Sequence, residues 1–385
     1  MLISESNDEI WRSIVHSIEA DIRSKNEAAQ SLALSLIATI VPDLLVAALS
    51  DTIIDLAISS KSSTAVSKKA IMCLSRIIKK HPNNYDVKKF ITPLSEMFDR
   101  KSSSLSYQNA AASFLLQLMN LANPDTLIEI QPKVVRLVHK LALHRSGGGD
   151  VSSSYVYFDH ANPWLQMKLY KALQLWSVPM EKGILTMIEE VLSKVLKKVS
   201  SSKSINKNNT EYGLLFEVIN VIIHYDKSVS SKLSEDVSKI LVVFITSSQA
   251  NIRYLGLEAM CRLALKQNLA THLEKILPNL DDKDISIRRR ALDLLYLICN
   301  HQNVSKIVAE LLGYLEARND PLMRDDLVLK IAILAEMFAE NLIWYVDVVV
   351  KLIQNAEVEN DIWYRIIQII TGIFCNNLGF GTANK

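Results

Sequence analysis

Glycine and proline are scarce in this chain, which has only 10 glycines and 9 prolines among 385 residues. These two residues supply the special backbone angles of tight turns, and both interrupt helices. Their scarcity, together with abundant leucine, isoleucine, lysine and alanine, argues against a fold rich in strands and turns. We expect helices that follow one another with short breaks between them.

Long apolar runs are also absent. The longest, LIATIVPDLLVAAL, is interrupted by Pro42 and Asp43 and falls short of the roughly 18 apolar residues that a membrane span requires. The opening residues MLISESNDEIW have neither the basic start nor the apolar core of a signal peptide. The four cysteines are far apart and include no CxxC pair, which is typical of core residues in a reducing compartment. We therefore expect a cytoplasmic protein.

Charge of one sign does not dominate either. The chain has 43 Lys and Arg against 41 Asp and Glu, which gives a net charge of +2. This balance gives no global reason to expect a nucleic acid or a membrane as partner. With 49% hydrophobic and 22% charged residues, the chain can bury a large core and is not expected to be disordered.

A repeated pattern is present instead. The segments VSKKAIMCLSRIIKK (66–80), NIRYLGLEAMCRLAL (251–265) and ISIRRRALDLLYLIC (285–299) share a polar or basic start and then apolar residues at helical spacing. Apart from two longer steps of 59 and 47 residues, the copies are 35 to 40 residues apart, close to the period of roughly 40 expected for HEAT or armadillo repeats. The matching anchor positions are Ala70, Ala110, Leu169, Phe216, Gly256, Ala291, Leu327 and Ile366.

A second amphipathic helix fits between the copies, for example at 126–143, 184–198, 303–317 and 342–356. Two helices per period predict an all-α fold, a right-handed alpha-alpha superhelix of the HEAT/ARM type. One helix pair alone cannot offset the entropy lost when its backbone is ordered, so each pair has to be buried between neighbours. The predicted organisation is a solenoid over 1–375 with a loop insertion at 144–163, a polar loop at 199–210 and a divergent, flexible tail at 376–385.

An aromatic cluster lies in the loop insertion and the helix after it, within YVYFDHANPWLQMKLYKALQLW (155–176). Asn162 is suited to cap a helix that begins at Pro163, and the two tyrosines before it suit an extended segment. A ligand pocket is the alternative to a structural role for these residues. We interpret four aromatic residues as anchors of the loop on the helical stack: Tyr155, Tyr157, Trp164 and Trp176.

Residues for catalysis or metal binding do not gather anywhere in the sequence. The eight histidines are scattered, none lies in an HExxH pattern, and no group of Cys or carboxylate residues has metal-ligand spacing. Gly147 to Gly149 do not form a phosphate loop, because no strand precedes them and no GKS or GKT follows. Asp159 beside His160 comes nearest to an acid/base pair, but adjacent residues in a loop commonly point apart. We expect no catalytic residue, no metal site and no cofactor.

Two groups of lysines are candidates for contact with an anionic membrane, which attracts each lysine by about 1 kcal/mol. The alternative is a solvated helix end, where cations are ordinary. No aromatic residues interleave with these groups, so nucleic acid is not expected, and we interpret Arg288 to Arg290 as the basic turn of the repeat. The candidates are Lys68, Lys69, Lys79, Lys80, Lys88 and Lys89 in the first group and Lys194, Lys197 and Lys198 in the second.

Several segments resemble the trunk of the large adaptin chains. The resemblance is carried by YVYFDHANPWLQMKLYKALQLW, NIRYLGLEAMCRLA and IRRRALDLLYLICN, and it is most distinctive from Arg253 to Ile370. The Tyr-x-Tyr before Pro-Trp-Leu is similar to the alpha class, which belongs to the endocytic clathrin adaptor complex. The segment from Asp159 to Asn162 departs from the usual loop of the family.

The resemblance implies a structural scaffold subunit without catalytic activity, at work in endocytic vesicle transport. Its implied partners are a small sigma chain, a medium mu chain and a beta-type large chain, and indirectly clathrin and cargo. Its implied location is the cytoplasm, peripherally on the membrane of a coated pit or vesicle. The resemblance implies a chain that is truncated at both ends relative to the family trunk, so we assign no lipid-binding or cargo-binding residue from the family.

Other functions stay open at this point. Another adaptin or a coatomer-type large chain would share the fold, and so would a generic HEAT-repeat scaffold or transport receptor. Importin-like carriers would be expected to line their inner face with regular Trp/Asn or acidic ladders, which this sequence does not have. An enzyme would need a convergent polar site, and none emerges from the sequence.

Overall fold

The chain is almost entirely helical. The computed structural model describes residues 8–41, 43–59, 62–99, 104–144, 151–198, 204–318, 320–339, 341–355 and 360–377. It divides into two compact units, unit 1 (Met1–Ser234) and unit 2 (Glu235–Lys385), and the division falls inside helix α11. None of the helices in the described ranges is long and apolar enough to span a bilayer.

The helices and strands follow one another with short connections. In unit 1 they are α1 (Asp8–Arg23), α2 (Glu27–Ile40), α3 (Asp43–Ile58), α4 (Thr64–Lys80), α5 (Ile91–Asp99), α6 (Leu105–Leu121), α7 (Gln131–Ala142), β1 (Val156–Tyr157), β2 (His160–Ala161), α8 (Pro163–Leu173), α9 (Lys182–Lys197) and α10 (Ile205–Tyr225). From the division onward they are α11 (Ser231–Ile245), α12 (Ala250–Ala264), α13 (Leu273–Ile276), α14 (Ile285–Ile298), α15 (Val304–Ala317), α16 (Arg324–Phe338), α17 (Leu342–Asn355) and α18 (Asn360–Asn377). Short 3-10 helices lie at Pro82–Asn84, Val87–Phe90 (η2), Pro124–Ile130 (η3), Ser153–Tyr155, Asp226–Ser228, Ala270–His272 and Leu277–Asp281.

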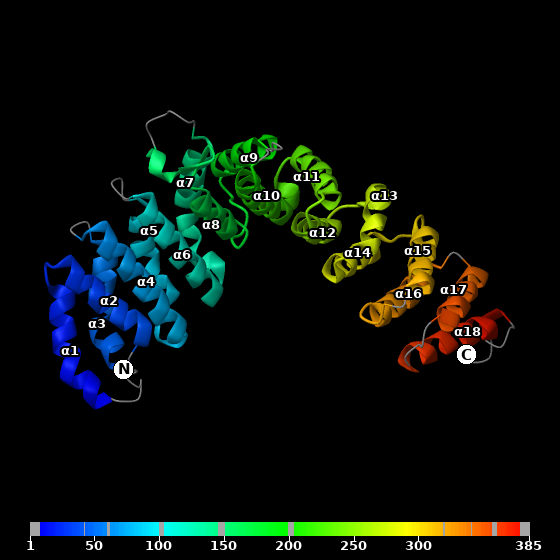
Figure 1. Cartoon of the computed structure of the whole chain (residues 1–385), viewed down its shortest axis with the longest axis horizontal. Helices are drawn as coiled ribbons and strands as arrows, with labels where there is room; N and C mark the ends of the chain where they lie inside the picture. Colours follow the sequence, from blue (N-terminus) through cyan, green and yellow to red (C-terminus); the bar gives the residue numbers. More distant parts are fainter. Residues whose placement is uncertain are drawn as a thin grey trace, which may run out of the picture. The chain divides into compact units, whose positions relative to one another are not determined.

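The helices of unit 1 form two rows (Figure 1). In the row that we call the A row, α2, α4, α6, α8 and α10 contact one another in order, and α3, α5, α7 and α9 do the same in the B row. Each B helix packs on the A helix that follows it in the chain, and α1 packs on α2 and α3. Unit 2 repeats the plan, with α12, α14 and α16 in order and α13 and α15 packed on α14 and α16. The predicted all-α stacking of the HEAT/ARM type is confirmed.

Local sequence explains where the helices begin and which faces they bury. The side-chain oxygens of Asn26, Ser63, Ser104 and Ser204 accept hydrogen bonds from amides in the first turns of α2, α4, α6 and α10. Six of the eight predicted anchor positions are buried, and the other two, Ala110 and Phe216, are half-buried. Burial of each large apolar side chain stabilises the stack by about 1.5 to 3 kcal/mol.

Three parts of the expected organisation differ from the structure. The helix expected at 126–143 is split into η3 and α7, because Pro132 has no amide hydrogen and Leu127 leaves the helical angles. Residues 205–210 of the polar loop expected at 199–210 are helical instead, because Ser204 caps a helix that begins at Ile205; residues 199–203 lie outside the described ranges. Residues 376 and 377, expected in the tail, belong to α18, which continues to Asn377; residues 378–385 lie outside the described ranges.

A line of arginine and aspartate residues joins the helix pairs of unit 2. Arg253 of α12 binds Asp282 with 2.7 Å between Nε and Oδ2, and Arg288 of α14 binds Asp320 with 2.7 Å between a guanidinium nitrogen and Oδ2. Arg288 also donates to the backbone carbonyl of Asp282 at 2.9 Å, so Asp282 connects the two arginines. We call Arg253, Asp282, Arg288 and Asp320 the Arg–Asp ladder. Its position between successive pairs supports the interpretation of Arg288 to Arg290 as part of the repeat.

Candidate functional site

A groove of about 1050 Å³ runs across the A row of unit 1. Its lining comes from α2, α4, α6 and α8, and it includes the exposed side chain of Met72. No lining residue among those described is acidic. We call this feature the cationic groove, and its five cations are Lys68, Lys69, Arg76, Lys79 and Lys168.

Neutral oxygen atoms hold three of these cations in place. Lys69 Nζ donates to Ser31 O at 3.2 Å and to Ser35 Oγ at 3.1 Å, and Arg76 Nε donates to Ala38 O at 3.4 Å. Lys168 Nζ donates to Ser113 Oγ at 2.6 Å on the neighbouring helix α6. Backbone carbonyls and hydroxyls orient these side chains but do not neutralise their charge.

The positive charge of the groove comes from a lack of acidic residues in the four A helices that line it. Helices α4, α6 and α8 contain no Asp or Glu, and α2 contains only Glu27. Burial lowers the pKa of the Lys168 ammonium, which is the expected effect on a cation with no carboxylate beside it. The groove therefore offers excess positive charge to any molecule that enters it.

The first predicted lysine group is divided by the structure. Lys68, Lys69 and Lys79 line the groove. Lys80 instead donates to the carbonyls of Ile40 and Val41, where a cation at a helix C-terminus is favourable. The exposed lysines Lys88 and Lys89 belong to η2 and lie outside the groove lining.

Sequence reasoning missed Lys168 as a groove residue. It is about 90 positions beyond the lysines of α4 and reaches the groove only because α8 packs on α6. A signal was present, because every A helix from α4 to α8 lacks acidic residues and they share one row. The shared lack of acidic residues becomes evident only after the helices have been assigned to rows.

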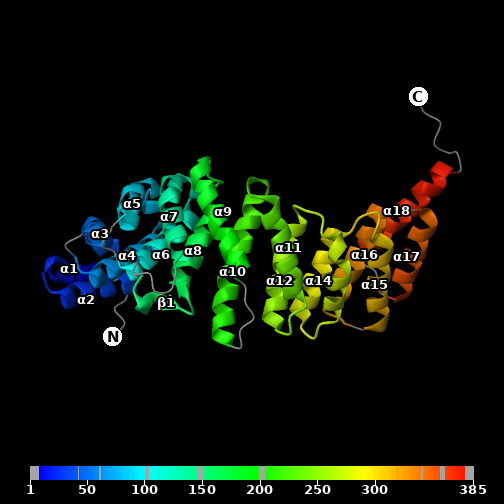
Figure 2. The same ribbon diagram turned by 90° about the horizontal axis from the view of Figure 1, so that it is seen from above.

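The aromatic cluster forms a hairpin beside α8 (Figure 2). Strands β1 and β2 are antiparallel, with Tyr157 opposite His160, and Phe158 and Asp159 at the turn both have positive φ angles. The Tyr157 ring is 4.5 Å from that of Phe158 and 5.1 Å from that of Trp164, centroid to centroid. The half-buried Tyr155 accepts a hydrogen bond at its carbonyl from the amide of Asn162, at 2.7 Å. As predicted, Asn162 caps α8 and Pro163 opens it.

Trp176 does not belong to this hairpin. It lies beyond the other end of α8 and is fully buried, whereas Trp164 is 53% exposed. Its indole nitrogen donates to the carbonyl of Pro124 at 3.0 Å, and its own carbonyl is 2.8 Å from His224 Nε2. Trp176 therefore links the end of α8 to η3 and α10, whereas the other three predicted anchors lie in the hairpin segment or at the start of α8.

The second predicted lysine group lies at the end of α9. Lys194 is half-buried, and Lys197 and Lys198 are exposed. Lys198 Nζ donates to the carbonyl of Asp159 at 3.1 Å, so this lysine ties the hairpin turn to α9. Burial, more than the nearby charge of Lys198, lowers the pKa of His160, whose Nε2 is 3.8 Å from Glu211 Oε1. This group is a surface cluster joined to the loop insertion.

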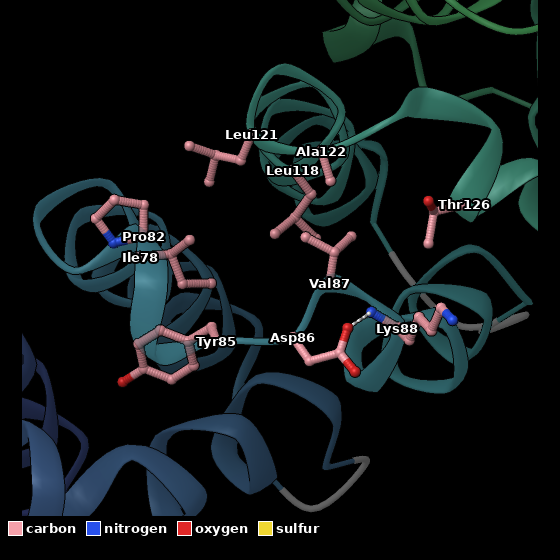
Figure 3. Close-up of a pocket in the computed structure, with 10 residues that line it drawn as sticks. All are labelled: Ile78, Pro82, Tyr85, Asp86, Val87, Lys88, Leu118, Leu121, Ala122 and Thr126. Atoms are coloured by element: carbon pink, nitrogen blue, oxygen red, sulfur yellow. Dashed lines mark hydrogen bonds between the residues drawn. The ribbon is translucent and has the colours of Figure 1, made fainter.

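A smaller hollow of about 270 Å³ lies beside the C-terminal ends of α4 and α6 (Figure 3). Apolar side chains such as Ile78, Leu118 and Val87 line much of it. Its one carboxylate, Asp86, accepts a hydrogen bond from the amide of Lys88 at 3.0 Å and so caps η2, while the Lys88 side chain points away from it. The ten lining residues include no histidine and no cysteine.

Buried thiols and scattered carboxylates complete the chemistry of the described ranges. Cys73, Cys261 and Cys299 are unpaired and buried. Burial raises the pKa of the first two thiols to about 12 and that of Cys299 to about 11, so they stay protonated at neutral pH and are poor nucleophiles. No group of three or more His, Cys, Asp or Glu residues in these ranges could hold a metal ion.

Comparison with known proteins places this architecture in a family. A family model described as the adaptin N terminal region matches residues 1–374. The chain is 35% identical to AP-2 complex subunit alpha-1 of Arabidopsis thaliana, over 96% of this chain and 36% of that protein. It is 36% identical to AP-2 complex subunit alpha-2 of Dictyostelium discoideum, over 96% of this chain and 37% of that protein. The chain thus spans a little over a third of the length of these relatives.

One structural neighbour has a similar arrangement of helices and supports the fold assignment. It is a homology model of the full-length AP-3 complex, with a TM-score of 0.56 and 16% identity, and the match covers 98% of this chain and 64% of that one. The resemblance to alpha-type adaptins that the sequence predicted is confirmed by the AP-2 relatives. This chain belongs to the adaptin N-terminal family, and its relatives include subunits of AP-2 adaptor complexes.

Proposed function

We propose that this chain is a structural scaffold subunit of a clathrin adaptor complex and acts in endocytic vesicle transport without catalysis. The observation that carries the proposal is its similarity, over 96% of its length, to alpha subunits of AP-2 complexes. Its proposed partners are a small sigma chain, a medium mu chain and a beta-type large chain. Contact with clathrin and cargo would be indirect.

The physical character of the chain supports a role in holding other proteins. Stacked helix pairs present long side-by-side surfaces, which suit extended protein interfaces. The thiols of Cys73, Cys261 and Cys299 are buried and protonated, and the carboxylate of the smaller hollow caps a helix. These features fit a scaffold better than an enzyme, because general acid or nucleophilic catalysis needs such groups free and close together.

Co-expression with candidate partners tests the proposal. We expect the tagged full chain to elute with sigma, mu and beta-type chains in about equal amounts, because stable subunit interfaces bury on the order of 2,000 Å² or more. The measurement is affinity capture followed by size-exclusion chromatography and mass spectrometry. An unrelated HEAT-repeat chain of similar length serves as the control. If the chain runs alone while the remaining partners assemble with a known alpha-type subunit, the proposal fails.

We also propose that the chain works in the cytoplasm and touches anionic membranes peripherally through exposed lysines outside the groove. The support is the exposure of Lys88 and Lys89 in η2 and of Lys197 and Lys198 at the end of α9. Lys194 lies one turn before Lys197 and adds to the same positive surface. Each lysine near such a surface contributes about 1 kcal/mol.

Vesicle flotation tests the membrane contact. The double variant Lys194→Glu/Lys197→Glu should bind vesicles of phosphatidylserine and phosphatidylcholine about tenfold or more weakly than the unchanged chain, because attraction becomes repulsion at two positions. The variant Lys232→Glu/Lys239→Glu makes the same change of charge on α11 and should keep most of the binding. Equal losses in both variants would mean that only net charge matters and would refute a specific lysine surface.

A further inference from the structure

The two units treat the cations of their A helices differently. In unit 2, cations that reach a neighbouring A helix find carboxylates: Arg290 of α14 pairs with Glu258 of α12 at 2.9 Å, and Lys330 of α16 pairs with Asp293 of α14. In unit 1, Lys69 and Arg76 of α4 and Lys168 of α8 reach the neighbouring helix in the same way and find only carbonyl and hydroxyl oxygens. The same kind of contact between A helices thus balances the positive charge at these sites in unit 2 and leaves it unbalanced at the groove in unit 1.

We propose that the cationic groove binds a carboxylate-rich segment of a partner protein, laid in extended form across α2, α4, α6 and α8. This inference deepens the proposed function, on which it rests, because it names the chemistry of a partner. Asp and Glu side chains of the segment would supply the negative charge that these four helices lack.

Preorganised cations favour such a segment. The hydrogen bonds of Lys69, Arg76 and Lys168 to neutral oxygens already restrict these long side chains, so less rotamer entropy is lost when an anion binds. Lys68 and Lys79 add charge without such restraint, because no hydrogen bond or ion pair holds their ammonium groups in the part of the chain that the structure describes. The exposed Met72 between them is a flexible apolar contact for the aliphatic parts of the segment.

The dimensions of the groove favour a peptide over a membrane or a small anion. Neighbouring helices lie about 8 to 10 Å apart, so three steps from α2 to α8 span roughly 24 to 30 Å. An extended chain of about eight residues covers that distance. A bilayer surface is flat on this scale and cannot enter a hollow between helices, and a single small anion would reach only some of the five cations.

Peptide titration tests the proposal directly. The probe is a fluorescein-labelled peptide of eight residues in which Glu and Ala alternate, titrated with the full chain and followed by fluorescence anisotropy. We expect saturable binding that weakens as salt rises from 50 to 150 mM and that is absent for the matching Gln and Ala peptide. The variant Lys68→Glu/Lys79→Glu should bind at least about tenfold more weakly, because two attractive charges become repulsive.

Two further variants make the result specific. Lys88→Glu/Lys89→Glu changes the net charge equally but outside the groove lining, and it should stay within about twofold of the unchanged chain. Lys68→Gln/Lys79→Gln removes charge without reversing it and should give an intermediate loss, and circular dichroism shows that each variant is folded. Equal losses of peptide affinity in Lys68→Glu/Lys79→Glu and Lys88→Glu/Lys89→Glu would overturn the proposal.

Other occupants of the groove would also give clear results. One such result is that phosphatidylserine vesicles or inorganic tripolyphosphate bind the unchanged chain but not Lys68→Glu/Lys79→Glu. If, in that case, the Glu peptide does not bind, the assignment of a peptide to the groove is overturned. Failure of peptide binding with intact capture of sigma, mu and beta-type chains refutes only this inference. Peptide binding without capture of those chains refutes only the proposed function.

Discussion

Replacing Trp176 with alanine is expected to lower the free energy of unfolding of unit 1 by about 4 kcal/mol. This value is typical for the removal of a large buried aromatic side chain. Trp176 is fully buried, and its indole nitrogen donates to the Pro124 carbonyl. The variant loses the apolar contacts, leaves a cavity and removes the hydrogen-bond donor from the part-buried Pro124 carbonyl. Urea unfolding of the full chain, followed by circular dichroism, measures the loss, and hydrogen exchange in α8 and α10 locates it.

Trp164→Ala is the matched control for this change. Trp164 lies near the start of α8 and is 53% exposed, so its removal should cost about 1 kcal/mol or less. A loss at Trp164 as large as that at Trp176 would mean that the hairpin aromatics hold the unit together after all. The two substitutions thus separate the two roles that one aromatic-rich segment plays.

Replacing Arg288 with alanine is expected to lower the stability of unit 2 by about 2 kcal/mol at pH 7. Breaking a fully buried pair costs about 3 to 5 kcal/mol, and the estimate is lower here because both side chains keep 14% of their surface exposed. The variant also removes the donor to the carbonyls of Asp282 and Lys283. Urea unfolding gives the size of the effect, and hydrogen exchange in α12, α14 and α16 shows where it acts.

The same variant has a characteristic pH dependence. Burial acts to raise the pKa of Asp320, but its hydrogen bonds from Arg288 and from the Leu322 amide outweigh burial and hold the pKa below its ordinary value of 3.8. Because the pKa of Asp320 is lower in the folded chain than in the unfolded chain, the Arg288–Asp320 pair contributes its full stability above the unfolded-state pKa. That contribution is lost as the pH falls through the folded-state pKa of Asp320. The difference between the unchanged chain and Arg288→Ala should therefore be constant from pH 7 to about 5 and shrink below about 4.

Arg289→Ala is the control for the ladder. Arg289 is the next residue, and its side chain is half exposed where it approaches Asp326. Its removal should cost less than about 1 kcal/mol, and the cost should depend little on pH. If Arg289→Ala equals Arg288→Ala in size, the ladder is not a specific link between helix pairs.

The helices were predictable because their signals are local. Apolar residues at helical spacing, such as those around Ala70 and Ala291, mark a buried face within one turn or two of chain. The caps at Asn162 and Ser204 are equally local, although only the first was read from sequence. The repeat period follows from the spacing of these faces, and it led to the right fold class.

The groove and the ladder were not predictable in detail, because both depend on residues that meet across helices. Lys168 joins the lysines of α4 only through α6, and Arg288 finds Asp320 32 residues along the chain. Spacing alone could not separate Lys79, which lines the groove, from Lys80, which caps α2. Nor could it place Trp176 away from the hairpin that precedes α8.

The period of the arginine contacts has an evolutionary consequence. Arg253, Arg288 and Arg324 are 35 and 36 residues apart. Their acceptors, Asp282, Asp320 and the Asn355 carbonyl, lie 29, 32 and 31 residues further along the chain. Duplication or deletion of one whole period in the gene would leave every remaining guanidinium facing an oxygen. A change by a fraction of a period would misalign them. The length of this region can therefore evolve in steps of one helix pair, and smaller insertions are confined to the connecting loops.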